Sequence, residues 1–120
     1  DRHCPILDRA YSALIDDLSD RGMLDDTLLI AMGEFGRTPK ISNRAAREHH
    51  KDCYFSIWAG GGIEPGRVIG ESDAKAEHPI TRPITPLQVG TTIAELCGIG
   101  ARKRAEMKVL DGGSVIHELI

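Results

Sequence analysis

The sequence contains few aromatic residues and no surplus of positive charge. Phe, Trp and Tyr together make up 4% of its 120 residues, and the formal net charge is −3. Proteins that bind nucleic acid typically carry a basic stripe and aromatic rings on which bases stack. The composition therefore argues against nucleic acid as a partner.

Long apolar runs and paired cysteines are also missing. No run approaches the roughly 18 apolar residues that indicate a membrane span. The chain opens on Asp1 without a signal-peptide pattern, and we expect this start to be cut from a longer protein. Cys4, Cys53 and Cys97 are odd in number, far apart and without Cys-x-x-Cys spacing, so they indicate neither a disulfide scaffold nor a zinc knuckle. The apolar neighbours of Cys53 and Cys97 predict core packing rather than a nucleophile.

Two segments have the pattern of a helix. Residues 5–21 carry apolar side chains at helical spacing, and Gly22 is a suitable stop. The stripe predicted to face the core consists of Leu7, Ala10, Leu14 and Leu18. A second helix is predicted to begin with Thr85 as N-cap and Pro86 in the first turn, and to end at Gly98.

The remaining pattern predicts strands and loops. Residues 27–32 and 53–59 are continuous apolar runs, typical of strands buried on both faces, as in a parallel sheet. Residues 67–70 predict a short strand, and residues 107–116 predict a hairpin with glycine at its turn. Residues 36–48 are polar and rich in arginine, which predicts a loop. The fold class is therefore α/β or α+β.

Two buried strands do not form a complete sheet. We therefore expect the chain to supply part of a larger sheet with flanking helices, completed by residues outside this sequence or by another chain. The exposed strand edges would also allow copies of the chain to pair as a homo-oligomer.

The loop that follows the first predicted strand is the leading candidate site. Glu34 and Arg37 place an acid and a base at the end of a strand, the edge at which α/β sheets bind ligands. Arg37, Arg44 and Arg47 make the loop locally basic, and a guanidinium offers a planar fork of donors to phosphate or sulfate. The alternatives are solvated charges, or ion pairs of Arg37 with Glu34 or Glu48.

The other motifs are weaker evidence for a functional site. Adjacent His49 and His50 would point to opposite faces of an extended chain, so one is a better metal-ligand candidate than both. The remaining histidines, His3, His78 and His117, are predicted to lie on the surface. Residues 61–66 have the glycine spacing of a phosphate loop, but Arg67 and Val68 follow where that motif needs Lys and Ser or Thr. Glycines 60–62 are instead expected to allow positive φ and close backbone approach.

Several strings resemble the C-terminal part of the DUF1501 family, over nearly the whole chain. They are Leu24-Asp25-Asp26-Thr27-Leu28, Met32-Gly33-Glu34-Phe35-Gly36-Arg37-Thr38-Pro39, Arg47-Glu48-His49, Ala59-Gly60-Gly61-Gly62-Ile63 and Arg82-Pro83-Ile84-Thr85-Pro86. That family is similar to a divergent branch of the alkaline phosphatase and sulfatase superfamily. The resemblance implies that residues 1–120 are the C-terminal portion of one alkaline-phosphatase-like domain, and that the parent protein is exported to the periplasm.

The resemblance also implies a site. Residues 34–36 stand where the superfamily has an Asp-His-Gly metal motif, so Glu34 would be a ligand of zinc, calcium or magnesium. Phe35 cannot replace the histidine. His49 matches a later histidine ligand, and Arg37 and Arg47 would bind the anionic group of a small substrate.

Two functions follow from the resemblance. The first is metal-dependent hydrolysis of phosphate or sulfate esters, inactive in the isolated 120 residues because the nucleophile would lie in the missing N-terminal part. The alternative, favoured by Phe35, is a non-catalytic binding or structural module with a degenerate metal site.

Overall fold

A computed structural model describes residues 3–120 as a mixed α/β fold with two small antiparallel sheets. In chain order the elements are α1 (Cys4–Asp20), the 3₁₀ helix η1 (Leu24–Asp26), β1 (Leu29–Met32), β2 (Gly36–Arg37), β3 (His49–His50), β4 (Ser56–Ala59), α2 (Pro86–Leu96) and α3 (Ala101–Met107). None of the helices in the described range has the length and apolar character needed to cross a membrane.

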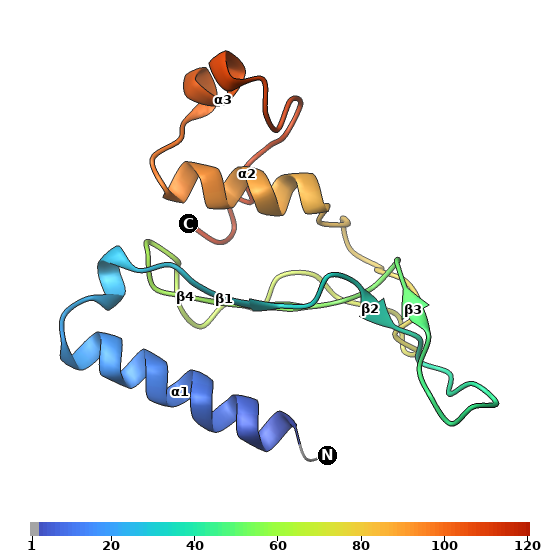
Figure 1. Cartoon of the computed structure of the whole chain (residues 1–120). Helices are drawn as coiled ribbons and strands as arrows, with labels where there is room; N and C mark the ends of the chain where they lie inside the picture. Colours follow the sequence, from blue (N-terminus) through green and yellow to red (C-terminus); the bar gives the residue numbers. More distant parts are fainter. Residues whose placement is uncertain (1–2) are drawn as a thin grey trace.

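The strands β1 and β4 form a sheet that lies between α1 on one side and α2 on the other (Figure 1). The hydroxyl of Tyr11 in α1 lies within hydrogen-bond distance of the carbonyl oxygens of Leu29 (3.3 Å) and Ile57 (3.4 Å), which share its single O–H donor. One helix residue thus reaches both strands of the sheet.

The strand pairing differs from the expected parallel sheet. β1 and β4 run antiparallel, with Leu29 opposite Ala59 and Met32 opposite Ser56. The expected burial on both faces is also wrong among the described residues: no residue of β1 or β4 is fully buried, and Met32 and Ile57 are exposed. An apolar run is therefore compatible with either strand direction, and here it belongs to strands that are only partly covered. The chain leaves β1, turns back through β2 and β3, and returns as β4.

The glycine run after β4 has the predicted backbone. Gly60, Gly61 and Gly62 all have positive φ, between 52° and 86°. A Cβ on Gly61 would lie 2.8 Å from the Cα of Leu28, and one on Gly60 would lie 2.5 Å from the carbonyl oxygen of Leu24. The expected close approach of backbone at this strand end is confirmed.

The helices begin and end largely as predicted. Thr85 and Gln88 form a capping box at the start of α2, which stabilises the first turn. Gly22 (φ 65°) and Gly98 (φ 77°) follow the ends of α1 and α2 in the left-handed conformation.

The C-terminal hairpin predicted over residues 107–116 is wrong, and so is the strand predicted over residues 67–70, which is irregular. Residues 101–107 form α3 instead, and the tail beyond it folds back over α2. Arg104 in α3 is 7% exposed and donates to Glu95 Oε2 (2.6 Å) and to the carbonyl of Ile99 (2.7 Å). A contact with the preceding helix therefore anchors α3.

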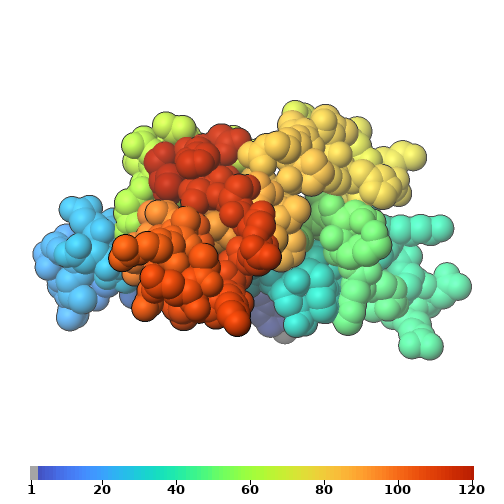
Figure 2. All heavy atoms as spheres, turned by 90° about the horizontal axis from the view of Figure 1, so that it is seen from above, coloured from blue at the N-terminus to red at the C-terminus, as the bar shows by residue number. Residues whose placement is uncertain are grey.

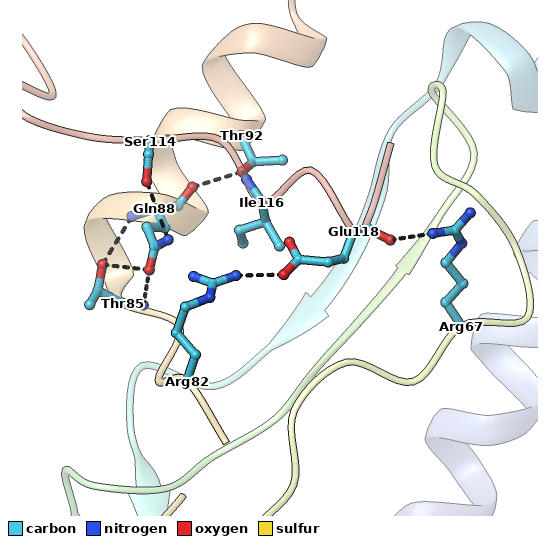
Figure 3. Close-up of polar contacts among 8 residues, drawn as sticks. All are labelled: Arg67, Arg82, Thr85, Gln88, Thr92, Ser114, Ile116 and Glu118. Carbon is cyan, nitrogen blue, oxygen red and sulfur yellow. Dashed lines mark hydrogen bonds and ion pairs between the residues drawn. The ribbon is translucent and has the colours of Figure 1, made fainter. Parts of the chain in front are cut away.

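The tail is held by a polar network (Figure 3). The N–H of Ile116 donates to the buried hydroxyl of Thr92 at 2.9 Å. Arg82 donates to the carboxylate of Glu118 at 2.6 Å, and Arg67 donates to the Glu118 carbonyl at 3.2 Å. Ile116, only 1% exposed, lies at the centre of this packing.

Much of the apolar surface has no cover within the described residues. Leu18 of the predicted helix stripe is buried, but Leu7 (50%) and Leu14 (43%) are exposed, so the expectation that the whole stripe faces a core is wrong. The prediction that Cys97 packs in the core is also wrong, because this residue is exposed. Cys53 is half-buried.

The molecule is also extended. It exposes 9013 Å², whereas a compact protein of its mass exposes about 6,400 Å². Its radius of gyration is 16.5 Å, against about 14 Å for a compact chain of this length. The fold has layers but only a small core of its own.

Candidate functional site

The ribbon formed by β2 and β3 brings together the two motifs singled out in the sequence. Arg37 pairs with His49, and Gly36 pairs with His50, across this antiparallel ribbon. Residues 36–48, predicted as loop, thus begin with a strand, and the segment 38–48 forms the tip. The structure places Glu34, Arg37, Arg47 and His49 in one region.

Gly36 is required for this ribbon to lie against the rest of the chain. It is buried, and a Cβ at its position would overlap the carbonyl oxygen of Cys53 and lie 3.0 Å from that of His50. A side chain at this position would push the ribbon away from Cys53. Steric overlap therefore explains why the second glycine of the Gly-Glu-Phe-Gly-Arg string, Gly36, cannot carry a side chain in this fold.

Three side chains stack at the base of the ribbon. The ring centroids of Phe35 and His49 lie 3.8 Å apart with an interplanar angle of 37°. The guanidinium carbon of Arg37 lies 5.2 Å from the centroid of the Phe35 ring, a cation–π distance. Phe35 therefore contacts both the candidate metal ligand and the candidate anion clamp.

Glu34 lies in the turn between β1 and β2, where it is exposed. Among the described residues its carboxylate makes no hydrogen bond or ion pair, so the alternative of a Glu34–Arg37 pair is not observed. The side chain is free to bind a ligand from solvent.

The metal-ligand set is incomplete within residues 3–120. No group of three or more His, Cys, Asp or Glu residues suited to a metal ion occurs there. Glu34 and His49 are two donors, whereas structural zinc sites use four protein ligands and catalytic sites use three. The described part of the chain does not by itself fit a complete metal centre.

Arg47 has a role that sequence reasoning missed. Its Nη1 donates to the backbone carbonyls of Thr38 (2.7 Å) and Pro39 (2.5 Å), and the Arg47 carbonyl accepts from Arg37 Nη1 at 3.4 Å. These contacts hold the tip of the ribbon closed. Arg37, whose guanidinium donates only this one long hydrogen bond among the described residues, has more donors left for an anion.

A second group forms beside β3. His50 Nε2 lies 2.8 Å from the carbonyl oxygen of Glu77, and the ring centroid of His50 lies 6.5 Å from that of His78. The ammonium of Lys51, which donates to Asp52 at 2.5 Å, lowers the pKa of the Asp52 carboxyl, and His78 and His50 act in the same direction. His78 is exposed, as are His3 and His117, which confirms their predicted surface position.

Surface depressions occur near the ribbon and near α3. One, of about 380 Å³, lies on the tip of the ribbon and is lined by Thr38, Lys40, Ile41, Ser42, Asn43 and Glu48. The other, of about 540 Å³, lies between α3 and the tail, away from the ribbon. Of these two, the smaller depression adjoins the candidate site.

Comparison with known proteins matches the chain to a protein family. The family model described as "Protein of unknown function (DUF1501)" matches residues 1–120. No curated protein and no solved structure matches the chain.

Proposed function

The chain belongs to the DUF1501 family, and from this premise we propose that it is the C-terminal portion of an exported hydrolase of the alkaline phosphatase and sulfatase superfamily. The reaction is the metal-assisted hydrolysis of a phosphate or sulfate ester. The 120 residues alone are inactive in this proposal, since the nucleophile lies in the preceding part of the parent protein.

The pairing of Arg37 with His49 across the ribbon carries the proposal. These residues are 12 positions apart in sequence, and the fold puts a guanidinium and an imidazole side by side after the unpaired carboxylate of Glu34. Hydrolysis of a phosphate or sulfate ester uses a hydrogen-bond donor to the anionic group beside residues that bind a metal, here a carboxylate and an imidazole.

In this proposal the residues of the ribbon and of the turn before it have different roles. Arg37 binds the non-bridging oxygens of the ester through its planar fork of N–H donors. Glu34 and His49 contribute two ligands to a divalent metal, and residues outside the described part complete its coordination. When bound, such a metal would supply Lewis-acid polarisation of the ester and activation of the nucleophile. Arg47 keeps the ribbon closed so that Arg37 and His49 stay opposite each other.

The open sheet agrees with a larger parent domain. Both β1 and β4 have only one strand neighbour among the described residues. The excess exposed area resembles a surface made to be covered by further strands and helices.

Calorimetry and ester hydrolysis on the intact parent protein test this proposal. We expect binding of a divalent metal and turnover of a model phosphate or sulfate ester. Glu34→Ala and His49→Ala should each weaken metal binding at least tenfold. Loss of a residue that only hydrogen-bonds a metal ligand already costs about that much, and loss of the ligand itself should cost more. An intact protein that binds no divalent metal would contradict the proposal.

A second candidate function is a non-catalytic module that keeps this fold for binding. The stack of Phe35 on His49 favours it, because the phenyl ring covers one side of the imidazole. In this case the intact protein shows neither metal binding nor ester turnover, and Glu34→Ala changes neither the calorimetric result nor the hydrolysis result. Ester turnover that is lost in Glu34→Ala excludes this candidate.

A further inference from the structure

Charge is unevenly distributed along the chain. The segment 36–51, which we call the basic arm, contains five Lys or Arg residues and one acidic residue, Glu48. Its formal charge is therefore +4, whereas the whole chain has −3, so the other residues together carry −7. The cationic residues are Arg37, Lys40, Arg44, Arg47 and Lys51.

The basic arm projects from the acidic body. Figure 1 shows β2 and β3 at one end of the molecule, with the tip loop extending beyond them. In the view of Figure 2, residues of this segment form the protruding end opposite α1. All five cationic residues of the arm are exposed. A basic projection on a body of net negative charge favours the approach of a polyanion through the arm.

The basic arm is held in one shape by its own hydrogen bonds. The N–H of Thr38 donates to the carbonyl of Glu48 (3.0 Å), and the N–H of Glu48 donates to the hydroxyl of Thr38 (3.1 Å). Nearer the tip, the N–H of Ser42 donates to the carbonyl of Ala46 at 2.8 Å. A surface that is ordered before binding loses less conformational entropy when it binds.

The side chains of the arm suit a sugar polymer better than a nucleic acid. Residues 36–51 contain no Phe, Trp or Tyr on which a base could stack. The ring of His49 already stacks on Phe35. The depression at the tip instead combines the charged side chains of Lys40 and Glu48 with the neutral polar side chains of Ser42 and Asn43, and such groups exchange hydrogen bonds with sugar hydroxyls.

We propose that the basic arm binds an anionic polysaccharide that carries sulfate or phosphate esters along its chain. The inference deepens the proposed function, because a polymer held along the arm would bring its esters to Glu34 and Arg37 at the arm's base. Lys40 and Arg44 bind the charged groups, and the tip depression takes a sugar unit. The substrate is then a polymer and not a small monoester.

The test is binding of heparin, used as the sulfated probe, to the intact protein at 50 and 200 mM salt. The double variant K40A/R44A should weaken binding about tenfold or more and lower the salt dependence, because two fewer counterions are released. The matched control R102A/K103A removes the same charge from α3, where both side chains are exposed. It should change affinity by less than about twofold, since its charges lie outside the arm.

Three outcomes would overturn the inference. They are absence of heparin binding at 50 mM salt, equal weakening by the two double variants, and equally tight binding of a single-stranded polynucleotide. Hydrolysis is measured separately with Glu34→Ala, a substitution that leaves Lys40 and Arg44 in place. Heparin binding without ester turnover would overturn the proposed hydrolase and keep the arm as a polysaccharide-binding surface.

Discussion

The imidazole of His49 stacks on the phenyl ring of Phe35, with centroids 3.8 Å apart. Phe35 stands at the position of the histidine in the Asp-His-Gly motif that this loop resembles. In the proposed function, Phe35 therefore stands where a third donor beside Glu34 and His49 would be expected.

Replacing Phe35 by histidine should create a stronger metal site. Phe35→His adds an imidazole within reach of His49, so the loop would present three donors in place of two. We expect zinc affinity, measured by calorimetry on the intact protein, to rise about tenfold or more. Phe35→Leu is the control, because it removes the ring and adds no donor. Equal zinc affinities of the two variants would show that His49 and residue 35 do not face a common ion.

Gly36→Ala should disrupt the ribbon. A Cβ at this position overlaps the carbonyl of Cys53, so β2 must move away from its contacts. We expect a loss of about 3 kcal/mol or more in the free energy of unfolding, in the range of severe backbone effects. Gly22→Ala is the matched control, since a Cβ there meets nothing within 4 Å and the cost is only that of a positive φ, about 1 kcal/mol. Urea titration measures both variants, and similar losses would contradict the steric explanation.

The predictable parts of the fold are those set by local chemistry. Thr85 and Pro86 specify the start of α2 with side chains that lie within one turn of it. Glycines 60–62 adopt the backbone that their composition favours. In contrast, the antiparallel direction of β4 depends on a partner strand 27 residues away, with the basic arm between them. An apolar run contains no information about that direction.

The α3 segment shows a second limit of sequence reasoning. Residues 101–107 are polar on most sides, so no apolar stripe predicts a helix. Its anchor is the ion pair of Arg104 with Glu95, which exists only once α2 has formed. Likewise, the sequence singled out Arg37 and His49 separately as candidate site residues, but only the fold shows that they are paired, and that Arg47 holds the backbone beside them.

Stability should depend on pH through Glu118. The hydrogen bond from Arg82 holds the pKa of this carboxyl below its usual value of 4.5 in the folded protein. A lowered pKa means that the contact stabilises the fold above pH 4.5, and that this contribution is lost as the pH falls through the folded-state pKa. Asp52 and Asp73, whose pKa values are also lowered, add to the same acid sensitivity.

Glu118→Gln should therefore flatten the change of melting temperature between about pH 6 and pH 3, because the variant has no carboxylate to protonate. Glu64→Gln removes the same charge from a carboxylate that lies 3.4 Å from Arg67, and it controls for net charge alone. Thermal unfolding followed by circular dichroism gives both profiles. Identical profiles for the two variants would show that the contact with Arg82 does not stabilise the tail.

Thr92→Val should loosen the tail without breaking α2. The hydroxyl of Thr92, on a fully buried residue, accepts from the N–H of Ile116 and donates to the carbonyl of Gln88. Valine has a similar shape but no acceptor, so the buried N–H of Ile116 loses its partner at a cost of about 1–3 kcal/mol. The helical carbonyl of Gln88 keeps its backbone donor, which is why α2 itself should persist.

Amide hydrogen exchange at Ile116 separates this explanation from a simple packing defect. In Thr92→Val the amide should exchange at least tenfold faster, because one hydrogen bond of about 1.4 kcal/mol protects it by that factor. Thr92→Ser keeps the acceptor and loses one buried methyl group, so it should lower stability slightly and leave Ile116 protected. Equal exchange rates in the two variants would mean that packing around Thr92, and not its hydroxyl, holds the tail against α2.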